Sequence, residues 1–351
     1  MTSPLRVPMI QVMGMVRRSL AAILACVAFA MSAHCDARAA SMPGPLGEFR
    51  SRLATFSQRA PGHVGVLVQD LTTGISTGIN ASANMPAASI IKIPVMVEVF
   101  RQMSLGTFDL NRKITLTRSD RDWGWGDLAS APGGARYTVS RLLWLMITDS
   151  DNTATNMLIR LVGRAHINTT MRELGLHQTR VGDYIRSNGD IRSLRSSPRD
   201  MTRLLVAMAH DELVDEWSSR EMVNILTGQR HNSLLPQPLP AGTQIAHKTG
   251  TLHDTLNDVG IVFLGTEPYV IAVMTTQLPT LDAGRRFIRG VSRLAYASFE
   301  RFAVLHASAV PALESPALRA PDVQMWTPLA PVPEPVATDP DTVSPAPSPT
   351  P

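Results

Sequence analysis

The sequence predicts a two-lobed fold of the α/β plus all-α type. In this fold, strands from both ends of the chain form one mainly antiparallel sheet, and a helical domain is inserted between them. Short β-branched runs bounded by glycine or proline lie near both ends, whereas the middle of the chain has helical periodicity. The two ends of the 351-residue chain lack a core-forming pattern. The folded domain is therefore expected at residues 40–304.

A helix and a hairpin are expected first. Residues 46–56 have a helical pattern, and residues 63–70 are typical of a strand. A turn at residues 71–74 then leads to a second strand toward Ile79. These elements supply the N-terminal half of the sheet.

The next element is an apolar helix at residues 90–103, in which Pro94 falls in the first turn, where a missing N–H costs nothing. A short strand is assigned to residues 114–117, but the middle of the chain is otherwise expected to be all helix. The further helices are expected at residues 139–147, 153–162, 167–174, 198–210 and 214–226. Three strands at residues 243–248, 258–264 and 269–275 and a long helix at residues 283–302 then close the fold.

The N-terminal end has the pattern of a secretory signal peptide. Arg17 and Arg18 precede the apolar run 20–33, and residues 37–39 offer small residues at a cleavable spacing. Residues 1–39 are therefore expected to be removed, leaving a periplasmic or secreted monomer with no transmembrane segment. Both cysteines, Cys26 and Cys35, lie in this region, so no disulfide is expected in the mature protein.

The C-terminal end, residues 305–351, is expected to be a disordered, proline-rich tail. From about Val310 onward proline is frequent and periodic apolar residues are almost missing. Both an inert tail and a spacer that contacts the cell envelope are compatible with this composition.

Charge and histidine spacing exclude several function classes. The formal net charge is +4, but four arginines and one aspartate within residues 1–39 account for three of these charges. The mature protein is thus nearly neutral, and no basic run interleaved with aromatic residues indicates a nucleic-acid partner. The nine histidines show no H-x-H or H-E-x-x-H spacing, so neither a metal nor another cofactor is expected.

Three short motifs carry the chemistry. Ser89-Ile90-Ile91-Lys92 places a hydroxyl and an amine one turn apart at the start of an apolar helix, where the lysine can reach the serine and the helix N-terminus favours negative charge. Ser150-Asp151-Asn152 lies between two predicted helices, and Lys248-Thr249-Gly250 ends a predicted strand. In this order, the motifs are the set typical of serine β-lactamases and penicillin-binding proteins.

The chain resembles class A β-lactamases from about residue 46 to residue 302. The segment 143–156 is similar to that family's helix-loop-helix around its second motif, and Lys248 to Thr251 followed by Asp258-Val259-Gly260 is similar to its third motif and next strand. The resemblance implies the family's fold and a serine hydrolase that opens β-lactam rings.

The resemblance also implies roles for individual residues. Ser89 would be the nucleophile that forms an acyl-enzyme, and Lys92 would take its proton if burial and neighbouring positive charge lower the amine's pKa. Ser150 would relay a proton to the leaving nitrogen with the help of Lys248.

Four further residues would bind the substrate. Asn152 would hydrogen-bond the substrate's side-chain amide, and Thr249, next to Gly250, would face its carboxylate together with Lys248. The backbone N–H groups of Ser89 and Thr251 would form the oxyanion hole.

One family residue is missing. The family activates its deacylating water with a glutamate, and an ungapped count from Thr179 puts Ile185 at that position. No glutamate occurs between Glu173 and Glu212. Asp183 and Asp190 are the nearest carboxylates, and each is either a substitute base or a structural residue.

Three functions follow from these observations. The first is a class A-type serine β-lactamase that opens the lactam through Ser89. The second is a penicillin-binding D-alanyl-D-alanine peptidase, whose acyl donor is a peptidoglycan stem peptide; the missing glutamate favours it. The third is a non-catalytic sensor of lactams or cell wall. Separately, Trp123-Gly124-Trp125-Gly126 is expected either to border the cleft or to pack between the lobes.

Overall fold

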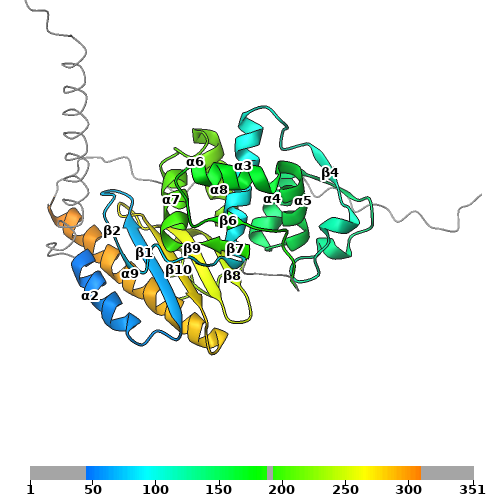
Figure 1. Cartoon of the computed structure of the whole chain (residues 1–351). Coiled ribbons are helices and arrows are strands. Elements are labelled where there is room, and N and C mark those ends of the chain that lie inside the picture. The colour runs from blue at the N-terminus through cyan, green and yellow to red at the C-terminus, as the bar shows by residue number, and fades with distance from the viewer. Residues whose placement is uncertain (1–44, 188–192, 310–351) are drawn as a thin grey trace, which may run out of the picture.

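A five-stranded antiparallel sheet forms one lobe of the protein (Figure 1). The structure is a computed structural model and describes residues 45–187 and 193–309. The strand order is β2-β1-β10-β9-β8. The strands are β1 (His63–Asp70), β2 (Ser76–Ile79), β8 (Gln244–Thr251), β9 (Leu256–Phe263) and β10 (Tyr269–Thr276). The prediction of a sheet assembled from both ends of the folded part is confirmed.

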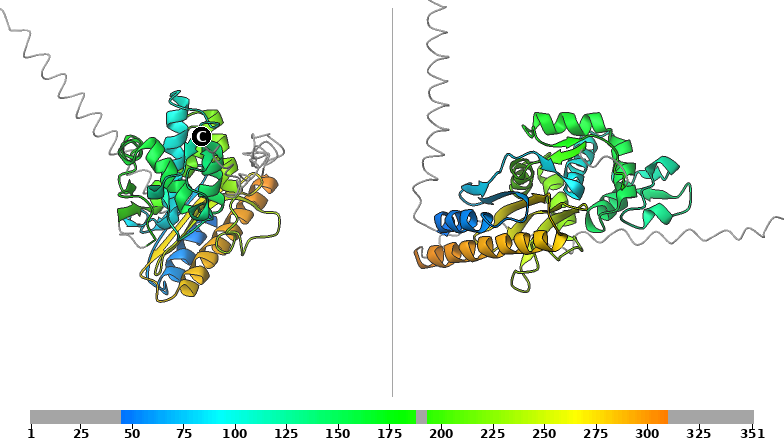
Figure 2. Two further views of the ribbon diagram at one scale, coloured as in Figure 1. Left: turned by 90° about the vertical axis from the view of Figure 1, so that its right-hand side faces the viewer. Right: turned by 60° about the horizontal axis from the view of Figure 1, so that its bottom comes forward.

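The sheet separates two apolar cores because successive side chains of a strand point to opposite faces. Ala272 belongs to the core shared with the helical lobe, whereas its neighbours Ile271 and Val273 belong to the core beneath α2 (Pro45–Ser57) and α9 (Leu281–Ala309). These two helices lie side by side on the outer face, as the blue and orange ribbons in Figure 2 show. The opposite face is covered by α7 (Pro198–Ala209).

The second lobe is helical and is organised around α3 (Lys92–Ser104). Its neighbours are α4 (Val139–Thr148), α5 (Asn152–Val162), α6 (Arg164–Glu173) and α8 (Glu216–Thr227), all of which contact α3. Each expected helix is present with ends shifted by a few residues. Helix α9 continues to Ala309, past the domain boundary predicted at residue 304.

The prediction that the middle of the chain is otherwise all helix is wrong. A three-stranded sheet of order β3-β7-β6 and a two-stranded sheet of β4 and β5 lie there. Their strands are β3 (Met85–Pro86), β4 (Lys113–Thr115), β5 (Arg136–Thr138), β6 (Arg180–Val181) and β7 (Leu194–Ser196). Strands of two or three residues are too short to show an alternating pattern in the sequence.

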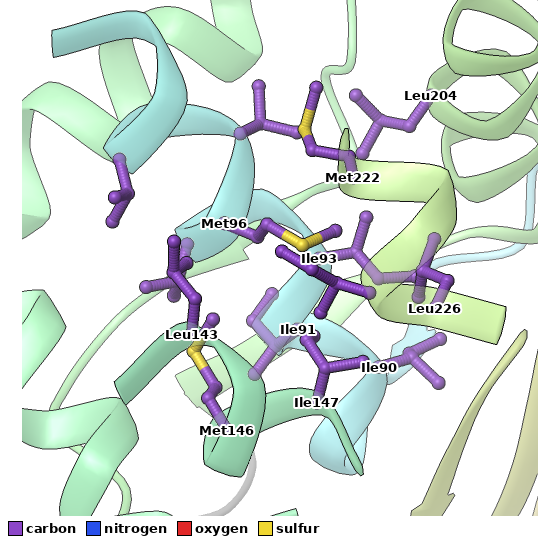
Figure 3. Close-up of a cluster of buried hydrophobic side chains, with 14 of the residues drawn as sticks. Ile90, Ile91, Ile93, Met96, Leu143, Met146, Ile147, Leu204, Met222 and Leu226 are labelled. Carbon is purple, nitrogen blue, oxygen red and sulfur yellow. The ribbon is translucent and has the colours of Figure 1, made fainter. Parts of the chain in front are cut away.

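An apolar cluster holds the start of α3 between the helices around it. Figure 3 shows Ile90, Ile91 and Ile93 among side chains from α4, α7 and α8, including Met146 and Met222. All five side chains have no solvent-exposed surface. Because these isoleucines are packed in the core, the adjoining polar residues Ser89 and Lys92 are held in defined positions.

The predicted signal peptide and most of the predicted tail lie outside the described residues. Within residues 45–187 and 193–309, no helix combines the length and the apolar character needed to span a membrane.

Candidate functional site

Ser89 lies in the 3-10 helix η1 (Ala88–Ile91), which leads directly into α3. It is partly exposed, whereas Ile90 and Ile91 are buried in the core. Ala88 adopts a left-handed backbone conformation with φ of 48°, which is uncommon for a residue with a side chain. Ser89 therefore lies in a tight turn just before the start of α3, at the edge of the apolar core.

Lys92 is the first residue of α3, and its side chain is fully buried. Its Nζ donates hydrogen bonds to the carbonyl oxygen of Ser150 at 2.6 Å, to Ser150 Oγ at 3.0 Å and to Asn152 Oδ1 at 2.8 Å. An ammonium group has three N–H donors, so these acceptors occupy all of them. None of the three acceptors is the hydroxyl of Ser89, which the helical spacing predicted to be the partner.

Ser150 lies between two lysines. Its Oγ is 3.0 Å from Lys92 Nζ and 3.1 Å from Lys248 Nζ. Its backbone has a φ of 55°, in the left-handed region, and such strain occurs at functional sites where the surroundings enforce it. The next residue, Asp151, is the N-cap of α5, and its side chain accepts a hydrogen bond of 2.7 Å from the backbone N–H of Ala154.

Both lysines have a lowered pKa, and burial is the main cause for each. Burial lowers the pKa of Lys92 well below its usual value, and the positive charge of Lys248 lowers it further, while Asp151 and Asp122 raise it. Burial also lowers the pKa of Lys248, to about 7, against the negative charge of Asp258. The neutral amine of Lys248 is therefore accessible near neutral pH, the neutral form of Lys92 is favoured by its burial, and the hydroxyl of Ser150 lies within hydrogen-bond distance of both amines.

Strand β8 passes close to the turn that carries Ser89. A Cβ atom at Gly250 would lie 3.1 Å from the backbone nitrogen of Ser89 and 3.0 Å from the carbonyl oxygen of Ala87, closer than an ordinary contact. Glycine thus allows the last residues of β8, including Thr251, to lie beside Ser89.

Asn257 on β9 holds the segment that precedes Ser89 close to the sheet. Its Nδ2 donates to the carbonyl oxygens of Pro86 at 2.9 Å and Ala87 at 3.0 Å, and its Oδ1 accepts from the backbone N–H of Thr275 at 3.0 Å. The sequence offered no specific signal for this role, although Asn257 directly precedes the Asp258-Val259-Gly260 segment noted above.

Two adjoining cavities open at Ser89. The larger has a volume of about 400 Å³ and the smaller about 270 Å³, and both are lined by Ser89, Trp125 and Thr251. Asn152 lines the larger cavity, whereas Ser150 and Thr249 line the smaller. All substrate-binding residues that the sequence predicted lie at or next to these cavities.

Trp125 lines both cavities. Its ring meets that of His231 edge to face, with centroids 5.7 Å apart, and it is about half exposed. Trp123 is 73% exposed and points away from this arrangement into solvent. The loop 123–126 thus borders the cleft, and one of its two tryptophans lines it.

Ile185 is the residue that the ungapped count from Thr179 predicts at the position of the family's glutamate. The side chain is buried, lines the larger cavity with Ser89 and offers no acid or base. Its backbone is held on both sides by Asn156, which accepts from the N–H of Ile185 at 2.8 Å and donates to its carbonyl oxygen at 3.0 Å.

Of the two alternative bases, Asp183 also lines the larger cavity, but it is exposed and forms an ion pair of 3.3 Å with Arg164. Asp190 lies outside the described residues.

A carboxylate that no sequence pattern indicated lies beside the site. Asp122 is buried, and its Oδ1 accepts a hydrogen bond of 2.7 Å from Asn152 Nδ2. The amide of Asn152 is therefore bonded to Lys92 through its oxygen and to Asp122 through its nitrogen, and one N–H remains for the predicted contact with a substrate amide.

In the parts of the chain that the structure describes, no group of three or more histidine, cysteine, aspartate or glutamate residues is arranged to hold a metal ion.

Comparison with known proteins gives consistent relatives. The β-lactamase of Streptomyces fradiae is 27% identical over 297 residues, which cover 79% of this chain and 95% of that protein. The solved structure of a protein named PBP-A is 30% identical with a TM-score of 0.69, over 72% of this chain and 96% of that chain. An ancestral class A β-lactamase is 27% identical with a TM-score of 0.65, over 71% of this chain and 99% of that chain.

The family model described as the beta-lactamase enzyme family matches residues 48–299. This range contains the two lobes and all three motifs. The extent of the match, together with relatives that align over nearly their whole length, shows that this chain belongs to the beta-lactamase enzyme family.

Proposed function

We propose that the protein is a class A-type serine β-lactamase that opens the lactam ring through an acyl-enzyme on Ser89. The observation that carries this proposal is the chain of hydrogen bonds from Lys92 through Ser150 to Lys248, which ends beside two cavities lined by Ser89. Several relatives are named β-lactamases, and one solved neighbour is described as an acyl-enzyme complex of a PBP-A mutant with penicillin G.

In the acylation step, Ser89 Oγ attacks the lactam carbonyl carbon, its proton passes to neutral Lys92, and the C–N bond then breaks. The depressed pKa of Lys92, caused first by burial, supports its use as a base. The lactam nitrogen leaves with a proton supplied through Ser150, which lies within hydrogen-bond distance of both lysines. Oxyanion N–H donors at Ser89 and Thr251 would each contribute about 10²–10³-fold in rate.

A burst experiment tests this function. The purified protein is mixed with a chromogenic cephalosporin, and the burst and the steady state are followed together with intact mass. Continued turnover through an adduct on Ser89 supports the β-lactamase. A stoichiometric burst with a persistent adduct refutes it and supports the peptidase or the sensor. Absence of an adduct refutes acylation at Ser89.

Substrate binding is expected to weaken as the pH rises above about 7. Lys248 is the proposed partner of the substrate carboxylate, and burial lowers its pKa to about 7, so its ammonium form is lost above that pH. The affinity for a carboxylate-bearing lactam is expected to fall by up to roughly tenfold per pH unit in this range. Calorimetric titration of Ser89→Ala with benzylpenicillin between about pH 6 and pH 9 measures this. A pH-independent affinity would contradict the role of Lys248, and Lys248→Met is the control with no titrating group.

The identity of Ile185 favours a second candidate function, a penicillin-binding D-alanyl-D-alanine peptidase that acts on peptidoglycan. An isoleucine at this place cannot activate the deacylating water. A β-lactam would then remain bound for long periods, whereas a stem peptide would be the natural acyl donor. The persistent adduct named above is the result that this function predicts.

We further propose that Asp183 accepts a proton from the deacylating water, because it is the described aspartate that lines the cavity with Ser89. Its exposure and its ion pair with Arg164 imply weak catalysis. Asp183→Asn is therefore expected to slow deacylation by at most about 10²-fold, the low end of the usual effect of a general base. Stopped-flow decay of a preformed acyl-enzyme checks this. An unchanged decay rate would exclude Asp183 and leave Asp190 as the predicted acceptor to be substituted next.

A further inference from the structure

Asp122 is a buried carboxylate that is satisfied by neutral groups. It is 5% exposed and lies between η2 (Arg118–Asp120) and η3 (Leu128–Ser130). The donors to its two oxygens are Asn152 Nδ2 at 2.7 Å, Ser187 Oγ at 2.5 Å, and the backbone N–H groups of Gly124 at 3.1 Å and Ser187 at 2.7 Å. Burial alone would raise the pKa of this carboxyl group, but the hydrogen bonds from Ser187 and Asn152 outweigh it, so the pKa is lowered.

The carboxylate determines which way the Asn152 amide faces. A carboxylate only accepts hydrogen bonds and an ammonium group only donates them. Asn152 must therefore turn its nitrogen to Asp122 and its oxygen to Lys92, as observed at 2.7 Å and 2.8 Å. The opposite orientation would place oxygen against oxygen and two donors against each other.

We propose that Asp122 is a positioning residue for acylation, which fixes the Asn152 amide and thereby holds Lys92 beside Ser150. This proposal rests on the proposed acylation at Ser89. Because donors already surround its oxygens, Asp122 supports Lys92 without being free to activate a water molecule. Asp122 thus provides a fixed negative charge for acylation, whereas deacylation needs a different group as its base.

Burial is the main cause of the lowered pKa of Lys92, and three charged groups modify it. Lys248 on β8 lowers the pKa of Lys92, whereas Asp151 at the start of α5 and Asp122 raise it. Removing the charge of Asp122 therefore lowers that pKa further, and neutral Lys92 persists to a lower pH. The decrease of the acylation rate on the acidic side of its pH profile should therefore also shift to lower pH.

Asp122→Asn tests the proposal. The new side-chain amide has one oxygen and one NH2 group, so its NH2 group would face an N–H or O–H donor that in the wild type bonds to a carboxylate oxygen. Acylation by a chromogenic cephalosporin is expected to slow by about 10–10²-fold, with its acid limb shifted to lower pH. Asp127→Asn is the matched control, since it removes the same charge from an exposed position of the same loop and should leave acylation unchanged. An unchanged rate and pH profile in Asp122→Asn would overturn the proposal.

A double variant tests whether Asp122 acts through Asn152. In the Asn152→Ala background, Asp122→Asn should cause little further loss, whereas multiplicative losses would contradict positioning. If Asp122→Asn does not fold, Asp122→Glu keeps the charge but displaces it, and a folded Asp122→Glu with the wild-type acylation rate would refute the proposal. Failure of wild-type protein to form the Ser89 adduct would instead refute the proposed function.

Discussion

Ser89→Ala is expected to abolish formation of the acyl-enzyme and to lower the acylation rate constant by about 10⁴–10⁶-fold. The reason is that Ser89 supplies the hydroxyl proposed to attack the lactam, whereas the lysine–serine–lysine chain beside it is proposed to move protons. Lys92 already donates to three acceptors, so it does not replace the missing hydroxyl.

The measurement is intact mass after incubation with benzylpenicillin, combined with cephalosporin turnover. Ser82→Ala is a suitable control, because Ser82 lies in the preceding segment and its hydroxyl accepts only a peripheral hydrogen bond of 2.9 Å from Arg199. An adduct of the same mass on Ser89→Ala would show that another residue is acylated, and the proposed mechanism would have to be abandoned.

Ile185→Glu is expected to accelerate deacylation by about 10²–10⁴-fold, the contribution of a well-placed general base. The new carboxylate would enter the larger cavity next to Ser89. Its backbone would stay in place, because both hydrogen bonds between Asn156 and residue 185 involve main-chain atoms. Burial should raise the carboxyl pKa toward neutrality, which suits a base that works near pH 7.

The decay of a preformed acyl-enzyme, followed by mass and by steady-state turnover, measures this gain. Ile185→Gln is the matched control, because it has nearly the same size and hydrogen-bonding reach but no basic carboxylate. Equal decay rates in the two variants would show that size or polarity, and not a base, controls deacylation at this position. No gain in either would mean that residue 185 does not face the attacking water.

Long elements with a clear period could be predicted from the sequence, and contacts between distant segments could not. Strand β1 has the predicted bounds His63–Asp70 because its apolar run is long and ends at a turn. By contrast, β3 and β6 have two residues each and pair only through β7, so their strand state depends on a partner far along the chain.

The candidate site shows the same division. Ser89 and Lys92 were found from their spacing, but the hydrogen-bond acceptors of Lys92 in the structure belong to residues 58 and 60 positions later, which helical geometry does not indicate. Asp122 is bonded to residues 30 and 65 positions away and belongs to no motif. A motif identifies the reacting groups, whereas tertiary contacts decide how they are oriented.

The two fully buried lysines also have a thermodynamic consequence for the whole molecule. Because the folded state lowers the pKa of Lys248 to about 7, the unfolded chain holds more protons on this side chain between about pH 7 and about pH 10.4. The contribution of Lys248 to the free energy of unfolding therefore rises with pH through this interval, and its full destabilising effect applies below it. The lowered pKa of Lys92 acts in the same direction. The amines that make acylation possible thus destabilise the native state at neutral pH, so that catalysis and stability are opposed at the same two nitrogen atoms.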